Sequence, residues 1–445
     1  MLAHELLLKS FQRAVGAADP LKIVPAYLPN GAALRSGKTL VIGAGKAAAS
    51  MAKAVEDNWP GDAPLEGLVI TRYGHGVATK TIRVIEAGHP VPDEAGERAA
   101  QEILARVQAL VPGDRLLALV SGGGSSLLAQ PVDGLSMADL KAITQSLLLC
   151  GATIQEINTV RKHLSRVQGG RLAQVAVERG ASVAALIISD VTGDDPTHIA
   201  SGPTVPDPTT YADALALLAH FKISEPKSAL DILHAGKRGE REETMKPGDA
   251  VFKHVDNRMI ATAHHSLEAA ADFFAAQGFA PVILGDHVTG EAREVAKVYG
   301  ALAKEVSQHP SAWKAHGYSF SGPIASIAKR GVALISGGET TVTVRGNGRG
   351  GRNVEFLLSL AVELDGLKNV YALAADTDGI DGGADNAGAL ITPDTLERAK
   401  AIGIDAKQSL ENNDGHGFFE ALGDQIVTGA TLTNVNDFRV ILVEL

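Results

Sequence analysis

TLVIGAGKAAASMAKA, residues 39–54, decides the fold class. An apolar run of β-formers is followed by a turn with Gly43 and Gly45, and then by helix-forming alanines. This order is typical of a parallel sheet wrapped by helices. Outward from it the same alternation continues, with strands expected at 68–71, 82–86, 116–120 and 183–189. We predict a Rossmann-like, doubly wound α/β/α domain, in which ligands bind beyond the carboxyl ends of the strands.

A polar, charged segment, GKRGEREETMKPGD at 236–249, interrupts this pattern and predicts a hinge. A second set of α/β units follows, with strands expected at 258–262, 281–284, 332–336, 340–344, 370–374 and 440–443. The two runs near 332–344, joined by Gly-Gly-Glu, predict an antiparallel hairpin and hence a mixed sheet. We expect an N-terminal domain over 1–240, a C-terminal domain over 250–445, and an active site in the cleft between them.

Length and composition exclude several classes of protein. A chain of 445 residues is too long for a single hydrophobic core, so we expect more than one domain. With 45% apolar and 21% charged residues, the composition is that of a globular protein that needs no disulfides or structural metals. A formal charge of −10 without runs of like charge argues against nucleic-acid or membrane surfaces. The single cysteine, Cys150, excludes an internal disulfide. No secretory signal or membrane span is apparent, so we predict a cytoplasmic protein, and we consider a homodimer.

The first glycine turn has three interpretations. Gly43 and Gly45 let the backbone approach a ligand, and Lys46 adds a positive charge, as a phosphate or carboxylate site requires. With Ala48 the pattern G-x-G-x-x-A also fits a dinucleotide turn, and it can be a structural turn. A dinucleotide site expects an acidic residue at the end of the second strand, where this chain has Thr71-Arg72. Arg72 could serve a 2′-phosphate, which leaves an NADP-dependent reductase open.

Two further loops follow apolar strands. SGGGSS at 121–126 offers free backbone N–H groups and three hydroxyl donors, suited to a triphosphate or carboxylate. ISDVTGDD at 188–195 brings Asp190 and Asp195 to a strand end, where carboxylates suit Mg²⁺ or proton abstraction. Arg161 lies in a basic stretch that is a candidate anion clamp, although solvated helix faces also account for such stretches.

The second half carries a comparable set of loops. Gly338 and Glu339 lie in the expected hairpin turn, and GRGGRN at 348–353 precedes an expected helix start. This loop combines backbone donors, guanidinium groups and a helix dipole. Asp376, Asp378 and Asp381 follow a buried strand. A glycine-rich loop in each half implies one ligand held between them.

These motifs together resemble the class II glycerate kinase family, whose members carry a carboxy-terminal MOFRL domain. The resemblance rests on GAGKAA (43–48), HPVPDEAG (89–96), SGGGSSLL (121–128), NTVRKHLSRVQGGRLA (158–173), SDVTGDDPTHIASGPTVPD (189–207), ISGGETTVTVRG (335–346), GRGGRNVE (348–355) and AADTDGIDG (374–382). It implies transfer of the γ-phosphoryl group of ATP to D-glycerate, giving 2-phosphoglycerate, with Mg²⁺. Some relatives carry the label hydroxypyruvate reductase.

The resemblance also implies residue roles. Lys46 and Arg352 match the lysine and arginine thought to act at the phosphates and the reacting centre, and Asp190 matches the aspartate of SDVTGDD. We expect Asp190 to be a base or, with Asp195, a Mg²⁺ ligand. Substrate and nucleotide are expected to contact Gly43, Gly45, Ser121, Gly122, Gly123, Gly124, Ser125, Ser126, Arg161, Gly338, Glu339, Asn353 and Asp378. The alternatives are an NADP-dependent hydroxypyruvate reductase and a non-catalytic sensor of nucleotides or sugar acids.

Overall fold

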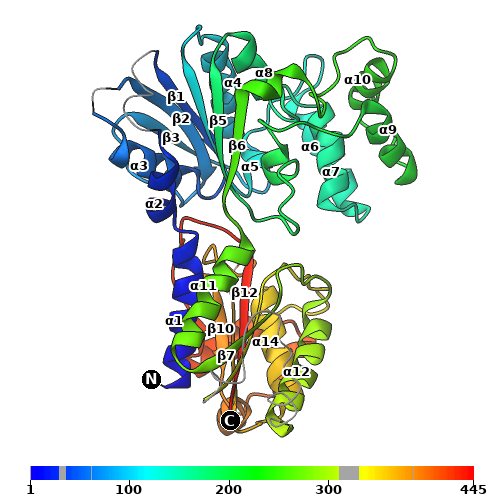
Figure 1. Cartoon of the computed structure of the whole chain (residues 1–445). Helices are drawn as coiled ribbons and strands as arrows, with labels where there is room; N and C mark the ends of the chain where they lie inside the picture. Colours follow the sequence, from blue (N-terminus) through cyan, green and yellow to red (C-terminus); the bar gives the residue numbers. More distant parts are fainter. Residues whose placement is uncertain (1, 30–36, 62, 310–329, 384) are drawn as a thin grey trace. The chain divides into compact units, whose positions relative to one another are not determined.

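The computed structural model describes residues 2–29, 37–61, 63–309, 330–383 and 385–445 (Figure 1). The chain divides into two compact units, each with its own sheet. We call Pro20–Ile260 the central unit, and Met1–Asp19 together with Ala261–Leu445 the terminal unit.

The central unit is built on a six-stranded sheet of order β3-β2-β1-β4-β5-β6. Its strands are β1 (Thr39–Ala44), β2 (Leu65–Arg72), β3 (Ile82–Ala87), β4 (Arg115–Val120), β5 (Ser182–Ile188) and β6 (Val255–Ala261). The pairs among β1 to β5 are all parallel. Helices α3 (Ala48–Asn58), α4 (Glu94–Gln108) and α8 (Arg171–Glu178) bury apolar residues in this unit. This confirms the Rossmann-like prediction, because the strand order is that of doubly wound sheets.

A helical subdomain with its own core lies within the central unit. It consists of α6 (Met137–Leu149), α7 (Ile154–His163), α9 (Tyr211–His220) and α10 (Lys227–Lys237), whose apolar faces meet in one cluster. Helix α7 ends next to the motif residues that follow β5, so this subdomain positions part of the site.

The terminal unit contains a mixed sheet of order β11-β10-β9-β12-β8-β7. Its strands are β7 (Phe279–Gly285), β8 (Gly331–Ser336), β9 (Val370–Asp376), β10 (Gly388–Ile391), β11 (Gln425–Ile426) and β12 (Asp437–Glu444). Only β7 and β8 are parallel neighbours among the pairs described; the others are antiparallel. Helices α12 (Ala292–Gln308) and α14 (Arg352–Leu364) share one core cluster of this unit. The mixed sheet is confirmed.

The predicted hairpin at 332–344 is wrong. Both neighbours of β8 are already provided, by β7 and β12, so no place remains for a strand at 340–344. At Gly338 the backbone has φ 97°, and a Cβ there would lie 2.2 Å from the carbonyl oxygen of Val288. The chain therefore leaves the sheet, and Thr341 makes only an isolated parallel bridge to Glu291.

The first helix, α1 (Ala3–Ala17), belongs to the terminal unit and not to the N-terminal domain expected over 1–240. Its Leu6, Leu7 and Phe11 pack in one core with α11 (Ala263–Ala276) and β12. Ser266 Oγ donates a hydrogen bond to the Ala14 carbonyl at 2.7 Å. The sequence of an amphipathic helix shows which of its faces is apolar, but it does not show which part of the protein packs against that face.

The segment at 236–249, which was predicted to be a hinge, lies inside the central unit and is hydrogen-bonded to other parts of that unit. Thr244 is buried and its Oγ1 donates to Asp207 Oδ2 at 3.0 Å. Glu243 accepts from the backbone N–H of Tyr211 at 3.1 Å, and its Oε1 lies 3.0 Å from His163 Nε2. The next strand, β6, was expected in the second sheet but completes the first. The polar composition of this segment predicted a linker. In the structure its polar side chains instead form hydrogen bonds and ion pairs within the central unit, which apolar periodicity does not reveal.

Glu243 makes the stability of the central unit sensitive to acid. Burial by itself raises its pKa, but hydrogen bonds from His163 and from the Tyr211 and Thr244 amides outweigh burial and lower it to about 2 from 4.5. A depressed carboxyl pKa contributes stability above the unfolded value, and that stability is lost as the pH falls from about 4.5 toward 2. We expect the urea midpoint of unfolding to fall between about pH 5 and pH 3. In Glu243→Gln this dependence should be shallower, whereas Glu411→Gln, at an exposed glutamate, should keep it.

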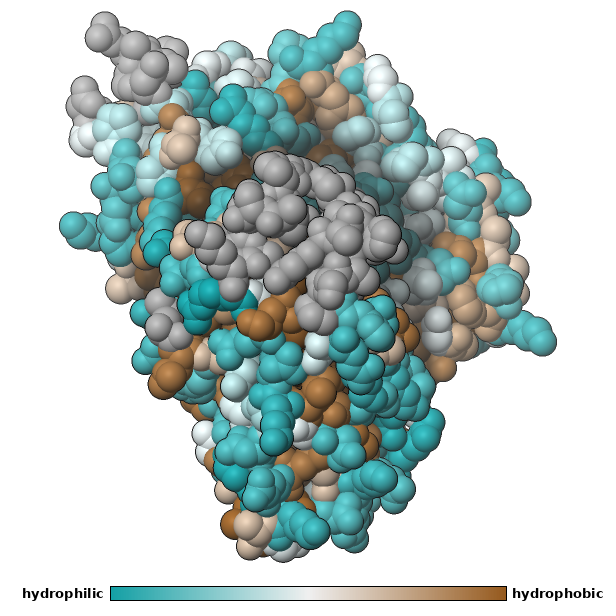
Figure 2. All heavy atoms as spheres, turned by 60° about the horizontal axis from the view of Figure 1, so that its bottom comes forward, coloured by the Kyte–Doolittle hydropathy of each residue, from teal (hydrophilic) through white to brown (hydrophobic). Residues whose placement is uncertain are grey.

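No helix in the described ranges is both long and apolar enough to cross a bilayer. Figure 2 shows one face of the molecule, on which hydrophilic residues predominate and apolar residues are interspersed.

Candidate functional site

The loops after β1 and β4 are tied together at the carboxyl edge of the central sheet. The backbone N–H of Lys46 donates to the Gly122 carbonyl at 2.8 Å, and the N–H of Ala47 donates to Ser121 Oγ at 3.1 Å. Because β1 and β4 are parallel neighbours, their ends meet at the edge where such sheets bind ligands. Lys46 and the Ser121–Ser126 loop are thus brought together as predicted.

Each glycine of the SGGGSS loop makes room for a different neighbour. A Cβ at Gly122 would lie 1.7 Å from Asp190 Oδ2, and a Cβ at Gly123 would lie 2.8 Å from His89 Nε2. At Gly124 it would lie 2.5 Å from the Cβ of Ala200. The glycines therefore allow a carboxylate and an imidazole to approach this backbone closely. Among the described residues, neither the N–H of Gly122 nor that of Gly123 donates a hydrogen bond to a backbone carbonyl.

Gly122 provides a direct test of this packing. In Gly122→Ala the new methyl group must displace the Asp190 carboxylate, since the two would otherwise overlap. We expect kcat of the reaction proposed below to fall by about 10- to 100-fold, because misplacing a reacting group by about 1 Å has effects of that size. Gly61→Ala, in open space, is the matched control and should retain activity. Normal turnover in Gly122→Ala would show that the position of Asp190 is unimportant.

The GxGxxA turn is filled by the protein itself. At Gly45, with φ 136°, a Cβ would lie 2.1 Å from Ser121 Oγ, so the second glycine accommodates Ser121. Gly43 lies within β1, paired with Val69 and Leu119 of the neighbouring strands, so the predicted contact of Gly43 with a ligand gains no support. In a dinucleotide turn the second glycine lets the pyrophosphate approach the backbone. Here a serine takes that space, which disfavours the dinucleotide interpretation.

Asp190 and Asp195 have different surroundings. Asp190 follows β5 and lies against Gly122. Asp195 is 52% exposed, accepts a hydrogen bond from the Thr197 N–H at 2.9 Å, and so closes its own turn. In the part of the chain that is described, no group of three or more His, Cys, Asp or Glu side chains is arranged around a metal position.

Arg161 is a cation without a counter-ion among the described residues. Its Nη1 donates to Asn158 Oδ1 at 3.0 Å, and no carboxylate within the described ranges pairs with it. Burial lowers its pKa to about 10, so it still carries its charge at neutral pH. An unpaired guanidinium that is partly desolvated favours an anionic ligand. Neither Asn158 nor His89 was predicted as a site residue. Both lie within the longer motifs, in which no spacing or residue type distinguishes them from their neighbours.

In the terminal unit, Arg352 is surrounded by acidic groups. Its Nη2 lies 2.6 Å from Asp376 Oδ2, its Nε 2.9 Å from Asp437 Oδ1, and its Nη1 3.3 Å from Glu339 Oε1. Burial alone would lower the pKa of Arg352, but these carboxylates raise it well above its ordinary value. Arg352 is therefore a fixed cation whose charge is already balanced. Asp437 was not predicted as a site residue, because it is 85 residues away in the sequence and follows no glycine motif.

Asn353 and the acidic residues after β9 hold the start of α14. Asp381 accepts from the backbone N–H groups of Asn353 and Val354 at 3.1 and 3.0 Å, and a Cβ at Gly351 would lie 2.3 Å from its carboxyl carbon. Burial raises the pKa of Asp381 to about 6 despite these bonds. Asp378 is buried and accepts from the Ile380 N–H at 2.8 Å. Of the predicted site residues in this half, Arg352 and Glu339 pair directly, whereas Arg352 and Asn353 are connected through Asp437.

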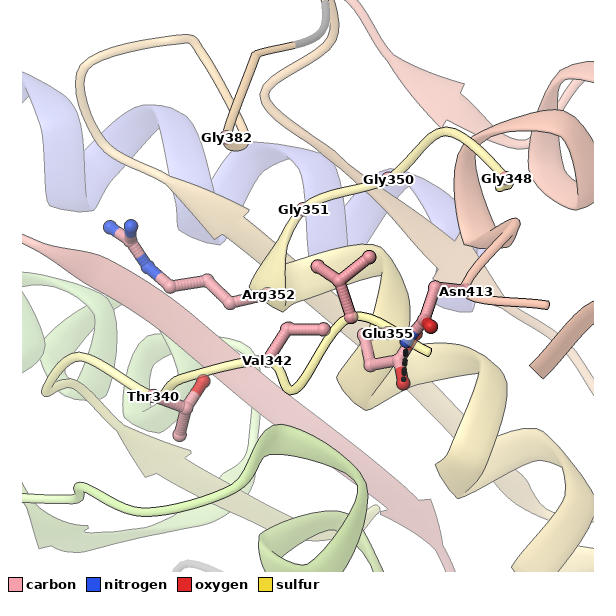
Figure 3. Close-up of a pocket in the computed structure, with 10 residues that line it drawn as sticks. Thr340, Val342, Gly348, Gly350, Gly351, Arg352, Glu355, Gly382 and Asn413 are labelled. Carbon is pink, nitrogen blue, oxygen red and sulfur yellow. Dashed lines mark hydrogen bonds between the residues drawn. The ribbon is translucent and has the colours of Figure 1, made fainter. Parts of the chain in front are cut away.

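A cavity of about 250 Å³ lies beside this cluster within the terminal unit. It is lined by Thr340, Val342, Val344, Gly348, Gly350, Gly351, Arg352, Glu355, Gly382 and Asn413. Figure 3 shows Asn413 bonded to Glu355, at 3.2 Å, and the Arg352 side chain extending away from that pair. Gly338 and Glu339 contribute no lining, and the glycines of the GRGGRN motif form part of the wall.

Comparison with known proteins agrees with this architecture. Residues 6–234 match a domain of unknown function, DUF4147, and residues 332–437 match the MOFRL family. A "putative hydroxypyruvate reductase" of Agrobacterium vitis is 47% identical, covering 99% of this chain and 94% of that protein. The "D-glycerate 2-kinase" of Thermotoga maritima is 37% identical, covering 99% and 98% respectively.

A solved structure shows the same fold. The crystal structure described as glycerate kinase (EC 2.7.1.31) from Thermotoga maritima has a TM-score of 0.84 and 36% identity, and 99% of each chain is covered. The fold and loops define a two-unit α/β protein with cations, carboxylates and glycine turns at strand ends. The chain belongs to the glycerate kinase family that carries a MOFRL domain, as the resemblance implied.

Proposed function

We propose that the chain is a glycerate 2-kinase, which transfers the γ-phosphoryl group of ATP to the 2-hydroxyl of D-glycerate. The observation that carries the proposal is the convergence of Lys46, the SGGGSS loop and Asp190 at one edge of the central sheet. Its full-length relatives with kinase names give the substrate.

Phosphoryl transfer requires alignment of the donor with the hydroxyl, and neutralisation of charge on the moving group. Lys46 and the N–H groups of Gly122 and Gly123 would contact the phosphate oxygens, and Arg161 would contact an anionic oxygen of the nucleotide or of the acid. Asp190 would accept the proton of the 2-hydroxyl. Arg352 would keep Asp376 and Asp437 and exchange the half-exposed Glu339 for the substrate.

Mg²⁺ fits the donors present in the central unit. It keeps several waters and usually takes one or two carboxylates beside the substrate phosphates, so the Asp190 carboxylate against the loop would hold it if Asp190 is a metal ligand instead of the base. When bound, Mg²⁺ would neutralise charge on the phosphates. Asp195 would contribute only if its turn opened, because its Oδ1 already accepts from Thr197.

A coupled assay tests the proposal. We expect ADP release that depends on D-glycerate, and NMR of the product should show phosphate on the 2-oxygen. The relative named as a hydroxypyruvate reductase makes that activity the second candidate, for which NADPH oxidation with hydroxypyruvate is the corresponding measurement. Reduction without glycerate-dependent ADP release would replace the kinase by the reductase, and neither activity would favour a sensor.

A further inference from the structure

A buried carboxylate in the terminal unit has one oxygen without a hydrogen bond in the described ranges. Glu355, in α14, is 2% exposed and lines the cavity of about 250 Å³. Its Oε1 accepts from Arg293 Nε at 2.8 Å and from Asn413 Nδ2 at 3.2 Å, and no donor among the described residues bonds to its Oε2. A buried carboxylate oxygen without a donor is unfavourable, so this atom favours a ligand that offers a proton.

The neighbours of Glu355 fix its orientation. Arg293 can only donate, and it holds Oε1 through both Nε and Nη2. The Oδ1 of Asn413 is already used, because it accepts from the backbone N–H groups of Arg345 and Gly346 at 2.7 and 3.1 Å. This pair therefore offers the cavity a single hydrogen-bond acceptor, Glu355 Oε2, in a fixed position.

The cavity also has groups that suit an anion. Arg352 lines it, and Figure 3 shows this side chain extending away from Glu355 and Asn413. Among the described residues, neither the N–H of Gly350 nor that of Gly351 donates a hydrogen bond to the protein. These two glycines precede α14, whose N-terminal dipole favours negative charge. The cavity thus combines one acceptor with a cation and backbone donors.

Two valines add an apolar wall. Val342 and Val344 line the cavity, and Val344 is 73% exposed. A ligand with an apolar face would cover this side chain and remove it from water, which is favourable. D-glycerate has no such face, because each of its carbons carries oxygen. A purine ring has two.

We propose that this cavity binds the adenine base of the nucleotide, with Glu355 Oε2 accepting a hydrogen bond from the 6-amino group and Val344 packing against the ring. This deepens the proposed kinase function and rests on it, because ATP is the phosphoryl donor of that reaction. An adenine nucleotide offers an amino donor, apolar ring faces and an anionic tail, which match the acceptor, the valines and the cation. Hypoxanthine and guanine carry an oxygen at position 6, which the carboxylate repels. Arg293 and Asn413 are positioning residues, since they hold Glu355.

Calorimetric titration of the full-length protein with ADP and with inosine diphosphate (IDP), both with Mg²⁺, tests this without turnover. IDP carries an oxygen where ADP carries the 6-amino group. We expect the wild-type protein to bind ADP about 10- to 100-fold more tightly, the size of a hydrogen bond to a charged group. Equal affinities would overturn the inference.

Glu355→Gln should reverse the preference. Because Arg293 only donates, the new amide must turn its carbonyl oxygen toward Arg293 and its NH₂ group toward the cavity. That group can donate to the 6-oxygen of IDP, so we expect IDP to bind about 2- to 10-fold more tightly than ADP. Glu363→Gln, on the same helix but paired with Lys304 at 2.6 Å, is the matched control and should keep the wild-type preference.

Val344→Ser gives a second measurement that does not depend on the folding of Glu355→Gln. Because Val344 is exposed, its substitution should leave the fold intact. Loss of the apolar contact should weaken ADP and IDP alike by about 3- to 10-fold. Val298→Ser, at an exposed valine of α12, is the control and should leave both affinities unchanged.

Several outcomes overturn the inference. A preference for ADP that survives in Glu355→Gln would show that Glu355 has a merely structural role, and unchanged affinities in Val344→Ser would remove the ring from the cavity. If Glu355→Gln raises the KM for D-glycerate and leaves both nucleotides as in the wild type, the acid occupies the cavity and the assignment to the base is wrong. Absence of glycerate-dependent ADP release in the wild type would reject the kinase itself, which is a separate result because nucleotide binding is measured alone.

Discussion

Lys46→Ala is expected to lower kcat by about 100- to 1,000-fold, the usual effect of removing one charge-stabilising group from a transition state. Lys46 follows β1 directly, and its backbone is bonded to Gly122 of the loop that approaches Asp190. We expect the ammonium group to offset charge that develops on the transferred phosphoryl group. Because that charge is largest in the transition state, KM should change much less than kcat.

Lys53→Ala is the matched control for this experiment. Lys53 lies in α3, the helix that follows the turn with Lys46, and it pairs near the surface with Asp57. Its loss should leave kcat and the thermal midpoint nearly unchanged. Near-normal turnover of Lys46→Ala, with the fold verified by circular dichroism, would remove Lys46 from the mechanism.

Lys162→Met is expected to lower the free energy of unfolding by about 3–5 kcal/mol, because it leaves a buried carboxylate without its partner. The Lys162 ammonium lies 2.7 Å from Asp207 Oδ1, and the two side chains are 1% and 0% exposed. Burial raises the pKa of Asp207, but Lys162 and the hydrogen bonds of Thr209 outweigh it and lower the pKa. Urea denaturation at neutral pH measures the loss.

The double variant Lys162→Met, Asp207→Asn separates charge from packing. It removes both charges, so it should be more stable than Lys162→Met alone if the unpaired carboxylate causes the loss. Lys53→Met, at a partly exposed position, should cost less than about 1 kcal/mol. A loss of that same small size in Lys162→Met would mean that the buried pair is not essential.

Much of the architecture followed from local pattern. Apolar β-rich runs alternating with helical segments predicted all five strands from β1 to β5, because a buried parallel strand needs apolar residues on both faces. The same argument placed Lys46, the SGGGSS loop and Asp190 at strand ends. Strand ends of a parallel sheet share one edge, so these residues had to lie near one another.

Other features depended on contacts between distant segments. The strand at 340–344 was excluded by β12, whose residues come about 100 positions later and occupy the neighbouring place in the sheet. Helix α1 joined the terminal unit because Phe274 and Phe438 cover its apolar face. Arg352 was predicted as an available cation, but Asp376 and Asp437 were needed to show that its charge is balanced.

By itself, then, the sequence determined the α/β class and the family, since these depend on period and motif order. The mixed second sheet was predicted from a hairpin that does not form, and the antiparallel neighbour of β8 is the distant strand β12. Only the tertiary structure decided that Ser121 fills the glycine turn, that His89 and Asp190 approach the glycines, and that carboxylates balance the charge of Arg352. The physical reason is that the space beside a glycine and the balance of a charge depend on neighbouring residues, and folding brings those neighbours together from distant parts of the chain.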